Sequence, residues 1–180
     1  MNERVFNGAF DRLRQPERLE RLEVNRVINI ISENREIKSA LDIGTGTAVF
    51  AEAFVKNGFE VSAIDLNPDM IEEAKLHAPN VTYKVAPAEN IPFEDNSFDL
   101  VFMGLVFHEV DNYEKALSEA KRVGKQVIAI LEWDYTLEEV GPPIDHRVDP
   151  EIIKDLYEKL KFHSFERINL TTLVLYILEI

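Results

Sequence analysis

Cysteine is absent from this sequence of 180 residues. Without a thiol the chain can form no disulfide, no thiolate metal site and no cysteine nucleophile. Long apolar runs are absent too: no stretch approaches the ~20 residues that a membrane-spanning helix needs, and the first residues contain no apolar signal core. We therefore expect a cytoplasmic protein with no membrane partner.

Basic residues are few relative to acidic ones. The chain has 20 lysines and arginines against 33 acids, and its formal net charge is −13. Most of such a surface repels a phosphate backbone, so we expect no nucleic-acid partner. The arginines near the start of the chain alternate with acids, a pattern typical of a solvated helix face; they are Arg12, Arg14, Arg18, Arg21 and Arg26.

The chain is long enough for one domain with a buried core and short for two. Its 46% hydrophobic and 29% charged residues are typical of a globular protein, and it contains no internal repeat. We expect a single domain in which residues 1–35 form an amphipathic helix or lid segment, with Phe6 and Phe10 in the lid. Residues 36–180 would form the ligand-binding domain.

Hydrophobic periodicity predicts the order of the elements. One amphipathic helix is expected over 16–34, followed by a strand that ends before Gly44 and by alternating helices and strands. Helices are expected to begin at Asn67-Pro68, at Asp111 or Asn112, and at Asp149-Pro150. The later strands are expected at 59–64, 81–85, 98–103, 127–131, 162–168 and 172–178.

The last two runs, 162–168 and 172–178, are joined too tightly for a helix and should pair as an antiparallel hairpin. Five strands that alternate with helices, followed by this hairpin, predict an α/β fold. We expect a doubly wound, Rossmann-like seven-stranded sheet, mostly parallel with an antiparallel last strand and with helices on both faces.

A glycine loop follows the first strand, in the sequence Leu-Asp-Ile-Gly-Thr-Gly-Thr at 41–47. Glycine allows a tight turn and a close approach of a ligand to the backbone, and the helix that follows presents unpaired amide donors. Asp65 ends the second strand, roughly 20 residues after the first glycine, where nucleotide-binding folds place a ribose-binding carboxylate. The pattern predicts a nucleotide-like cofactor against this loop.

In a doubly wound sheet, ligands bind at the carboxyl ends of the central strands. The candidate site residues therefore follow strands one, two, four and five; they are Gly44 to Thr47, Asp65, Met103 to Glu109, and Glu132 to Tyr135.

From roughly Ser39 to Leu178 the chain resembles the class I S-adenosylmethionine-dependent methyltransferases of the small seven-stranded type. Besides the glycine loop, the motifs that carry the resemblance are Ala-Ile-Asp-Leu-Asn-Pro-Asp-Met at 63–70, Ala-Glu-Asn-Ile-Pro-Phe at 88–93, Phe-Asp-Leu-Val at 98–101, and Ala-Leu-Ser-Glu-Ala-Lys-Arg-Val at 116–123. Each motif is weak alone, but their order and spacing are specific.

The resemblance implies S-adenosylmethionine as the cofactor and a role for each matched residue. The loop of Gly44, Thr45 and Gly46 would support the methionine moiety, with Asp42 ordering the loop, and Asp65 would bind the ribose hydroxyls.

The resemblance also implies the contacts to the base and to the methionine ammonium. Leu66 would pack on the adenine, and the backbone near Ala88, with Glu89 beside it, would meet the adenine edge. Met103 and Gly104 would offer carbonyl oxygens to the ammonium group.

The chain departs from the pattern of this family at three places. Ala48 replaces the third glycine of the loop, and Gly124-Lys125-Gln126 shortens the proline-glycine turn before the fifth strand. Pro87 replaces the aspartate that reads the adenine amino group, which removes an acceptor and a backbone donor. We expect this to weaken cofactor binding by about 1–2 kcal/mol, or Glu89 to take over.

Methyl transfer needs positioning, and it needs a base only when the nucleophile arrives protonated. His108 and Glu109 follow strand four on the correct edge of the sheet and are the candidates for that base. The alternative interpretation is that they only pack the loop. We expect no metal site, since His, Asp and Glu show no ligand spacing.

Four further residues are candidates for contacts to the substrate. Glu132 and Trp133 end strand five, where an acid and an aromatic side chain can line an acceptor cavity, although Trp133 fits the core equally well. His146 and Arg147 end a proline-rich loop as anion contacts, unless Arg147 pins that loop through a carboxylate.

These observations favour a methyltransferase with a small-molecule acceptor, because little chain remains for an acceptor site beyond the cofactor-binding part. The alternative is a non-catalytic S-adenosylmethionine-binding protein, either a sensor or a partner subunit. A nicotinamide dehydrogenase is disfavoured because Val49 stands where the dinucleotide-binding fingerprint Gly-x-Gly-x-x-Gly has its third glycine. Methylation of the exocyclic amines of nucleic acid bases is disfavoured because Met103-Gly104-Leu105-Val106 stands in place of Asn-Pro-Pro-aromatic. The oligomeric state stays open, with a homodimer as one expectation.

Overall fold

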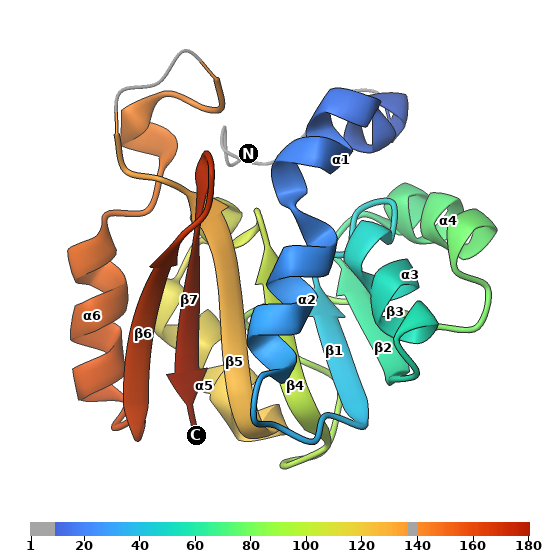
Figure 1. Ribbon diagram of the computed structural model, residues 1–180. Coiled ribbons are helices and arrows are strands. Elements are labelled where there is room, and N and C mark those ends of the chain that lie inside the picture. The colour runs from blue at the N-terminus through green and yellow to red at the C-terminus, as the bar shows by residue number, and fades with distance from the viewer. Residues whose placement is uncertain (1–9, 137–139) are drawn as a thin grey trace.

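The computed structural model describes residues 10–136 and 140–180. Its seven strands form one sheet in the order β3-β2-β1-β4-β5-β7-β6 (Figure 1). All neighbours pair in parallel from β3 to β5, whereas β7 runs antiparallel to both β5 and β6. The strands are β1 Ser39–Ile43, β2 Glu60–Asp65, β3 Thr82–Val85, β4 Phe98–Gly104, β5 Gly124–Trp133, β6 Ser164–Asn169 and β7 Leu173–Glu179. The predicted fold class and the terminal hairpin are confirmed.

Helices cover both faces of this sheet. In Figure 1, α2 lies in front of the central strands and α5 lies behind them. The helices are α1 Pro16–Leu22, α2 Val24–Ser32, α3 Val49–Lys56, α4 Pro68–His77, α5 Tyr113–Val123 and α6 Pro150–Lys159. Three 3₁₀ turns accompany them: η1 Phe10–Arg14, η2 Phe107–Glu109 and η3 Ile144–His146. None of the helices in the described parts of the chain is both long enough and apolar enough to cross a bilayer.

The alternation of side chains along the strands builds two hydrophobic cores. Leu100 and Phe102 of β4 face α2 and α3, while Val101 and Met103 face the core that contains residues of α5 and α6. From Leu100 to Met103, β4 is apolar on both sides, as is typical of a strand at the centre of a sheet. The carboxyl end of β4, at Gly104, therefore lies between the two cores.

The helix predicted over 16–34 is wrong as a single element. Glu23 has a left-handed backbone, with φ 46°, and it separates α1 from α2. The carboxylate of Glu23 accepts a hydrogen bond from the amide of Thr171 at 2.7 Å, in the turn between β6 and β7. A break of one residue leaves the apolar spacing nearly intact, so periodicity cannot reveal it.

The predicted helix starts are confirmed by their caps. The side chains of Asn67, Asn112 and Asp149 each accept a hydrogen bond from a backbone amide in the first turn of α4, α5 and α6. Asn112, and not Asp111, is therefore the cap of α5. The turn before β5 is short because α5 ends at Val123 and the strand begins directly at Gly124.

Candidate functional site

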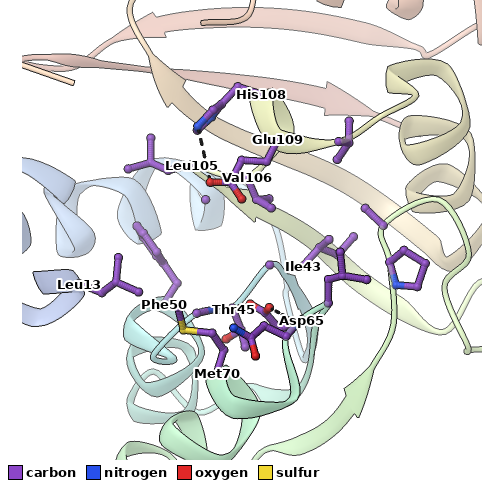
Figure 2. Close-up of a pocket in the computed structure, with 18 of the residues that line it drawn as sticks. Leu13, Ile43, Thr45, Phe50, Asp65, Met70, Leu105, Val106, His108 and Glu109 are labelled. Carbon is purple, nitrogen blue, oxygen red and sulfur yellow. Dashed lines mark hydrogen bonds and ion pairs between the residues drawn. The ribbon is translucent and has the colours of Figure 1, made fainter. Parts of the chain in front are cut away.

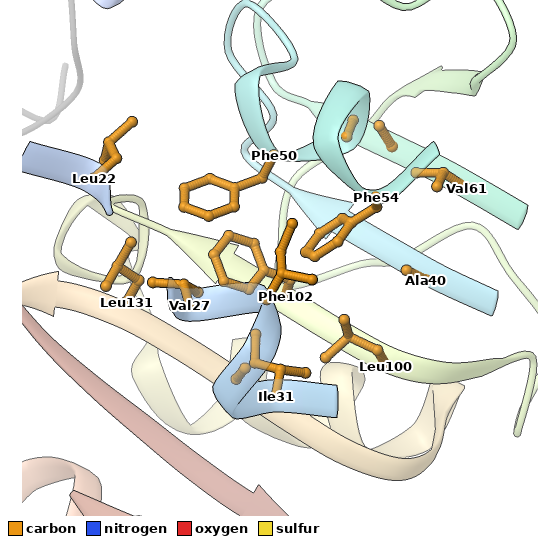
Figure 3. Close-up of a cluster of buried hydrophobic side chains, with 14 of the residues drawn as sticks. Leu22, Val27, Ile31, Ala40, Phe50, Phe54, Val61, Leu100, Phe102 and Leu131 are labelled. Carbon is orange, nitrogen blue, oxygen red and sulfur yellow. The ribbon is translucent and has the colours of Figure 1, made fainter. Parts of the chain in front are cut away.

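A cavity of about 1020 Å³ opens at the carboxyl ends of β1, β2 and β4. In Figure 2, Thr45, Asp65 and Met70 lie on one side of it, and His108 and Glu109 lie on the other. Leu22 and Phe50 also line it, and both belong to the buried cluster shown in Figure 3, so the wall of the cavity is continuous with a core. Its size suits a cofactor together with a small second ligand, since ligand pockets measure roughly 300–1,000 Å³.

The glycine loop forms one wall of the cavity. The amides of Gly44 and Thr45 both donate to the carbonyl oxygen of Ile64, at 2.8 and 3.1 Å, which ties the end of β1 to β2. Gly44 and Gly46 have φ values of +66° and +53°, which residues with a Cβ rarely adopt. At Gly44 a Cβ would lie 2.3 Å from Cγ2 of Val106, so the loop approaches the segment after β4 too closely for any other residue.

Ala48 occupies the position of the missing third glycine. It also has a left-handed backbone, with φ 60°, and serves as the N-cap of α3. The loop therefore keeps its left-handed turn without glycine there, at a conformational cost of about 1–2 kcal/mol. This departure leaves the path of the chain around the cavity intact.

Asp42 lies beneath the loop. Its carboxylate is 3% exposed and accepts a hydrogen bond from the hydroxyl of Thr45 at 2.7 Å. Burial raises the pKa of Asp42 to about 7, since the loss of hydration outweighs the hydrogen bonds that favour the charged form. Through Thr45, Asp42 orders the loop from below and does not itself line the cavity.

Asp65 lines the cavity beside the loop, at the end of β2. One carboxylate oxygen accepts a hydrogen bond from the amide of Gly46 at 2.8 Å, and the other accepts one from the amide of Asn67 at 2.9 Å. Burial raises the pKa of Asp65, and these amides oppose the rise. The carboxylate is thus fixed in orientation, next to Leu66, a cavity-lining leucine that is 61% exposed.

The segment after β3 closes the same end of the cavity. Pro87, Ala88 and Glu89 all line it. One carboxylate oxygen of Glu89 accepts hydrogen bonds from the amides of Asp111 and Asn112, at 2.9 and 3.2 Å. Glu89 therefore joins this segment to the start of α5.

Two residues at the end of β4 were expected to offer carbonyl oxygens. Gly104 lines the cavity, whereas the side chain of Met103 is fully buried in the core behind it. A Cβ at Gly104 would lie 2.7 Å from the ring of Phe102, so the backbone there must be bare.

His108 and Glu132 form a buried pair at the other end. The imidazole Nδ1 lies 3.0 and 2.9 Å from the two carboxylate oxygens of Glu132, which also accept hydrogen bonds from the amides of His108 and Trp133. A carboxylate only accepts, so Nδ1 carries the proton of this hydrogen bond, and Nε2 holds the lone pair whenever the ring is neutral. Nε2 lies 3.9 Å from an oxygen of Glu109 (Figure 2). His108 and Glu109 line the cavity, and Glu132 lies behind them, 1% exposed.

Of the other three substrate candidates, one lines the cavity and two lie away from it. Trp133 lines the cavity, whereas His146 and Arg147 do not. The guanidinium of Arg147 is buried and donates to four backbone carbonyls, those of Asp134, Thr136, Val140 and Pro142. Arg147 pins its loop, as the alternative interpretation anticipated, but through carbonyl oxygens and not through a carboxylate.

Arg18 of α1 is a cavity residue that the sequence interpretation missed, because its neighbours suggested a solvated face. A signal was available: Arg18 precedes Leu22 by one helical turn, so both lie on the face that lines the cavity. Leu13 of η1 joins them there. Phe6 lies outside the described residues, and Phe10 does not line the cavity. Within 10–136 and 140–180 no cluster of acids and histidines suits a metal ion.

Comparison with known proteins agrees with this geometry. Residues 41–127 match the family described as "Methyltransferase domain". A demethylmenaquinone methyltransferase of Renibacterium salmoninarum is 34% identical over 93 residues, 49% of this chain and 39% of that protein. A ubiquinone/menaquinone biosynthesis C-methyltransferase of Rickettsia felis is 30% identical over 137 residues, 69% of this chain and 50% of that protein. The chain thus spans half or less of the length of these curated relatives.

A solved structure covers nearly the whole chain. The SAM-dependent methyltransferase from Aquifex aeolicus superposes with a TM-score of 0.83 and 26% identity, over 95% of this chain and 96% of that one. Residues 41–127 thus match a methyltransferase domain, and the fold is that of the class I, Rossmann-like methyltransferases, whose cofactor is S-adenosylmethionine.

Proposed function

We propose that this protein transfers the methyl group of S-adenosylmethionine to a small-molecule acceptor. The observation that carries the proposal is one continuous cavity, which the glycine loop and Asp65 line on one side and the His108–Glu132 pair borders on the other. This arrangement supports a cofactor and a proton-accepting group that share one cavity, as methyl transfer to a protonated nucleophile requires.

The cofactor side has the features that a nucleoside with an amino-acid tail needs. The fixed carboxylate of Asp65 suits a ribose diol, because charged acceptors form the stronger hydrogen bonds with hydroxyl groups. Leu66 offers an exposed apolar surface to a base, and the bare backbone at Gly44, Gly46 and Gly104 admits a close approach. When bound, the cofactor supplies a methyl group activated by a sulfonium.

On the acceptor side we assign His108 the role of general base and Glu132 that of its positioning residue. Glu132 holds the Nδ1 proton and fixes the ring plane, which leaves the basic lone pair on Nε2. Glu109, near Nε2, is the alternative base. Leu22, Leu105 and Trp133 surround this end with apolar surface that excludes water.

Pro87 keeps a second function open, that of a protein that binds the cofactor without catalysis. A proline beside the place expected for the adenine offers neither a side-chain acceptor nor an amide donor to it. The protein then binds S-adenosylmethionine and never forms S-adenosylhomocysteine from any acceptor. A methyl-transfer assay with a small-molecule extract separates the two functions.

Calorimetry with S-adenosylhomocysteine tests the cofactor assignment. Asp65→Asn removes the charge and keeps the shape, so we expect binding to weaken by about tenfold to a hundredfold, from the loss of about 1.5–3 kcal/mol of charge-assisted hydrogen bonding. Asp69→Asn is the matched control: it is an exposed acid four residues further on, outside the cavity, and should bind as the wild type does. Equal affinities for all three proteins would contradict the ribose assignment.

A further inference from the structure

Arg18 is a cation at the cavity for which the described residues provide no hydrogen-bonding partner. It lines the cavity from α1 and is half-buried. In the described parts of the chain its guanidinium makes no hydrogen bond and no ion pair, whereas Arg14 in the neighbouring η1 binds the carbonyl of Thr47 and the carboxylate of Glu52.

The electrostatic surroundings of Arg18 work against its charge. Burial lowers the pKa of its guanidinium, and the nearby positive charge of Arg21 lowers it further, while the carboxylate of Glu109 opposes both. A guanidinium has five N–H donors, and taking such a group out of water is costly unless an acceptor replaces the water. Arg18 is buried in this way at the wall of the cavity, so a ligand in the cavity can supply the missing hydrogen-bond acceptor.

The charge balance at this end of the cavity favours a ligand with a single negative charge. A guanidinium fork matches a carboxylate with two parallel hydrogen bonds. A doubly charged phosphate would find one guanidinium here, with Glu109 close enough to repel it. Lys115, the other cavity-lining cation among the described residues, is exposed in the first turn of α5, the helix whose start is joined to Glu89.

Apart from His108 and Glu109, the side chains around Arg18 on this wall are apolar. Leu13 and Leu22 stand on either side of Arg18 along the chain, and Trp133 closes the end of β5. A polar or highly charged molecule would lose its hydration against these side chains, whereas an apolar body gains about 25 cal/mol for each Å² buried.

We propose that the methyl acceptor is a small carboxylate with an apolar body, whose carboxylate group binds Arg18. This inference rests on the proposed function, since it names the substrate class of the same site. It makes Arg18 a specificity-determining residue: Arg18 selects the anion, and His108 faces the other end of the bound molecule.

The single tryptophan of the chain reports directly on this site, and the cofactor is not needed for the measurement. Trp133 lines the cavity, so its fluorescence can follow the titration of the full chain with benzoate, phenylacetate and hexanoate, each paired with its neutral amide. We expect each carboxylate to bind at least about tenfold more tightly than its amide, from the loss of one charged hydrogen bond in the amide.

Two variants assign that preference to Arg18. Arg18→Gln should remove the preference of carboxylate over amide, and Arg18→Lys should retain part of it, since the charge stays and the fork is lost. Arg12→Gln is the control for net charge, because Arg12 is exposed and outside the cavity. Thermal unfolding checks that each variant is folded. If Arg18→Gln does not fold, the carboxylate preference of Arg18→Lys is compared with that of the wild type instead.

Three outcomes overturn the inference: no carboxylate preference in the wild type for any of the three pairs, an unchanged preference in Arg18→Gln, or a preference lost equally in Arg12→Gln. Calorimetry with S-adenosylhomocysteine keeps this inference separate from the proposed function. Arg18→Gln should bind that ligand as the wild type does. A wild type that binds carboxylates through Arg18 and does not bind S-adenosylhomocysteine would contradict the proposed function alone.

Discussion

Replacing Gly44 by alanine should destabilise the protein much more than the same replacement at Gly46. Both glycines have positive φ, so an alanine at either position pays about 1–2 kcal/mol for a left-handed backbone. Alanine also reduces the entropy of the unfolded chain by a similar amount at both sites, and that contribution cancels in the comparison.

The two sites differ in the space around the new methyl group. At Gly44 the Cβ would lie 2.3 Å from Cγ2, 2.6 Å from Cβ and 3.0 Å from Cγ1 of Val106, whereas at Gly46 the nearest atom is Cδ1 of Leu13 at 3.4 Å. Forcing an extra methyl group into packed surroundings costs about 1–3 kcal/mol. The free energy of unfolding should therefore be about 1–3 kcal/mol lower for Gly44→Ala than for Gly46→Ala.

Denaturant titration of the two variants measures this difference, and changes at Val106 test its origin. In the Gly44→Ala background, Val106→Gly removes all three contacting atoms and should restore the stability that the clash costs. Val106→Ala leaves the Cβ contact and should restore only part of that stability. Equal losses for the two glycine variants, or no recovery in the double variants, would refute the close approach of the loop to the segment after β4.

Three further predictions concern buried polar groups. Burial raises the pKa of Asp42 to about 7, so the folded chain holds a proton that the unfolded chain has released, and the free energy of unfolding should fall by up to about 4 kcal/mol as pH rises from about 4 to 7. Asp42→Asn should remove this part of the pH dependence, which denaturant titrations at about pH 4 and about pH 8 would detect. Glu132→Gln should lower kcat by about tenfold to a hundredfold and leave S-adenosylhomocysteine binding unchanged, because Glu132 orients His108 from behind the cavity; an unchanged kcat and pH profile would contradict that role. Arg147→Lys should destabilise the loop by about 1–3 kcal/mol, since a lysine cannot reach four carbonyls at once, and faster limited proteolysis of the segment 134–148 would show it.

Much of the fold was predictable because its signals are local. The caps at Asn67 and Asp149 and the apolar run of β4 each belong to one short segment, and the structure confirms them. The break at Glu23 was not predictable, since it depends on a hydrogen bond from Thr171, at the other end of the chain. Such contacts leave no trace in hydrophobic spacing.

The side of the cavity on which the glycine loop and Asp65 lie was predictable from the sequence for a similar reason. Its loop and Asp65 follow consecutive strands, and the fold brings the ends of β1 and β2 together. The contacts of Glu89 were not foreseen, because they join the segment after β3 to the start of α5 across the sheet. Whether Glu89 compensates for Pro87 stays a prediction.

The pairing of His108 with Glu132 follows from the register of two central strands. Gly104 of β4 lies opposite Leu131 of β5, so the segment that follows β4 and the last residues of β5 meet at the same edge of the sheet. The sequence placed both residues at that edge but interpreted them separately, with Glu132 as an acid that lines the acceptor cavity. Because the carboxylate of Glu132 is engaged by His108 and two amides behind the cavity, it cannot serve a cation there. Among the described residues, the cation that lines this end of the cavity is Arg18, which is why we infer an acceptor with a negative charge.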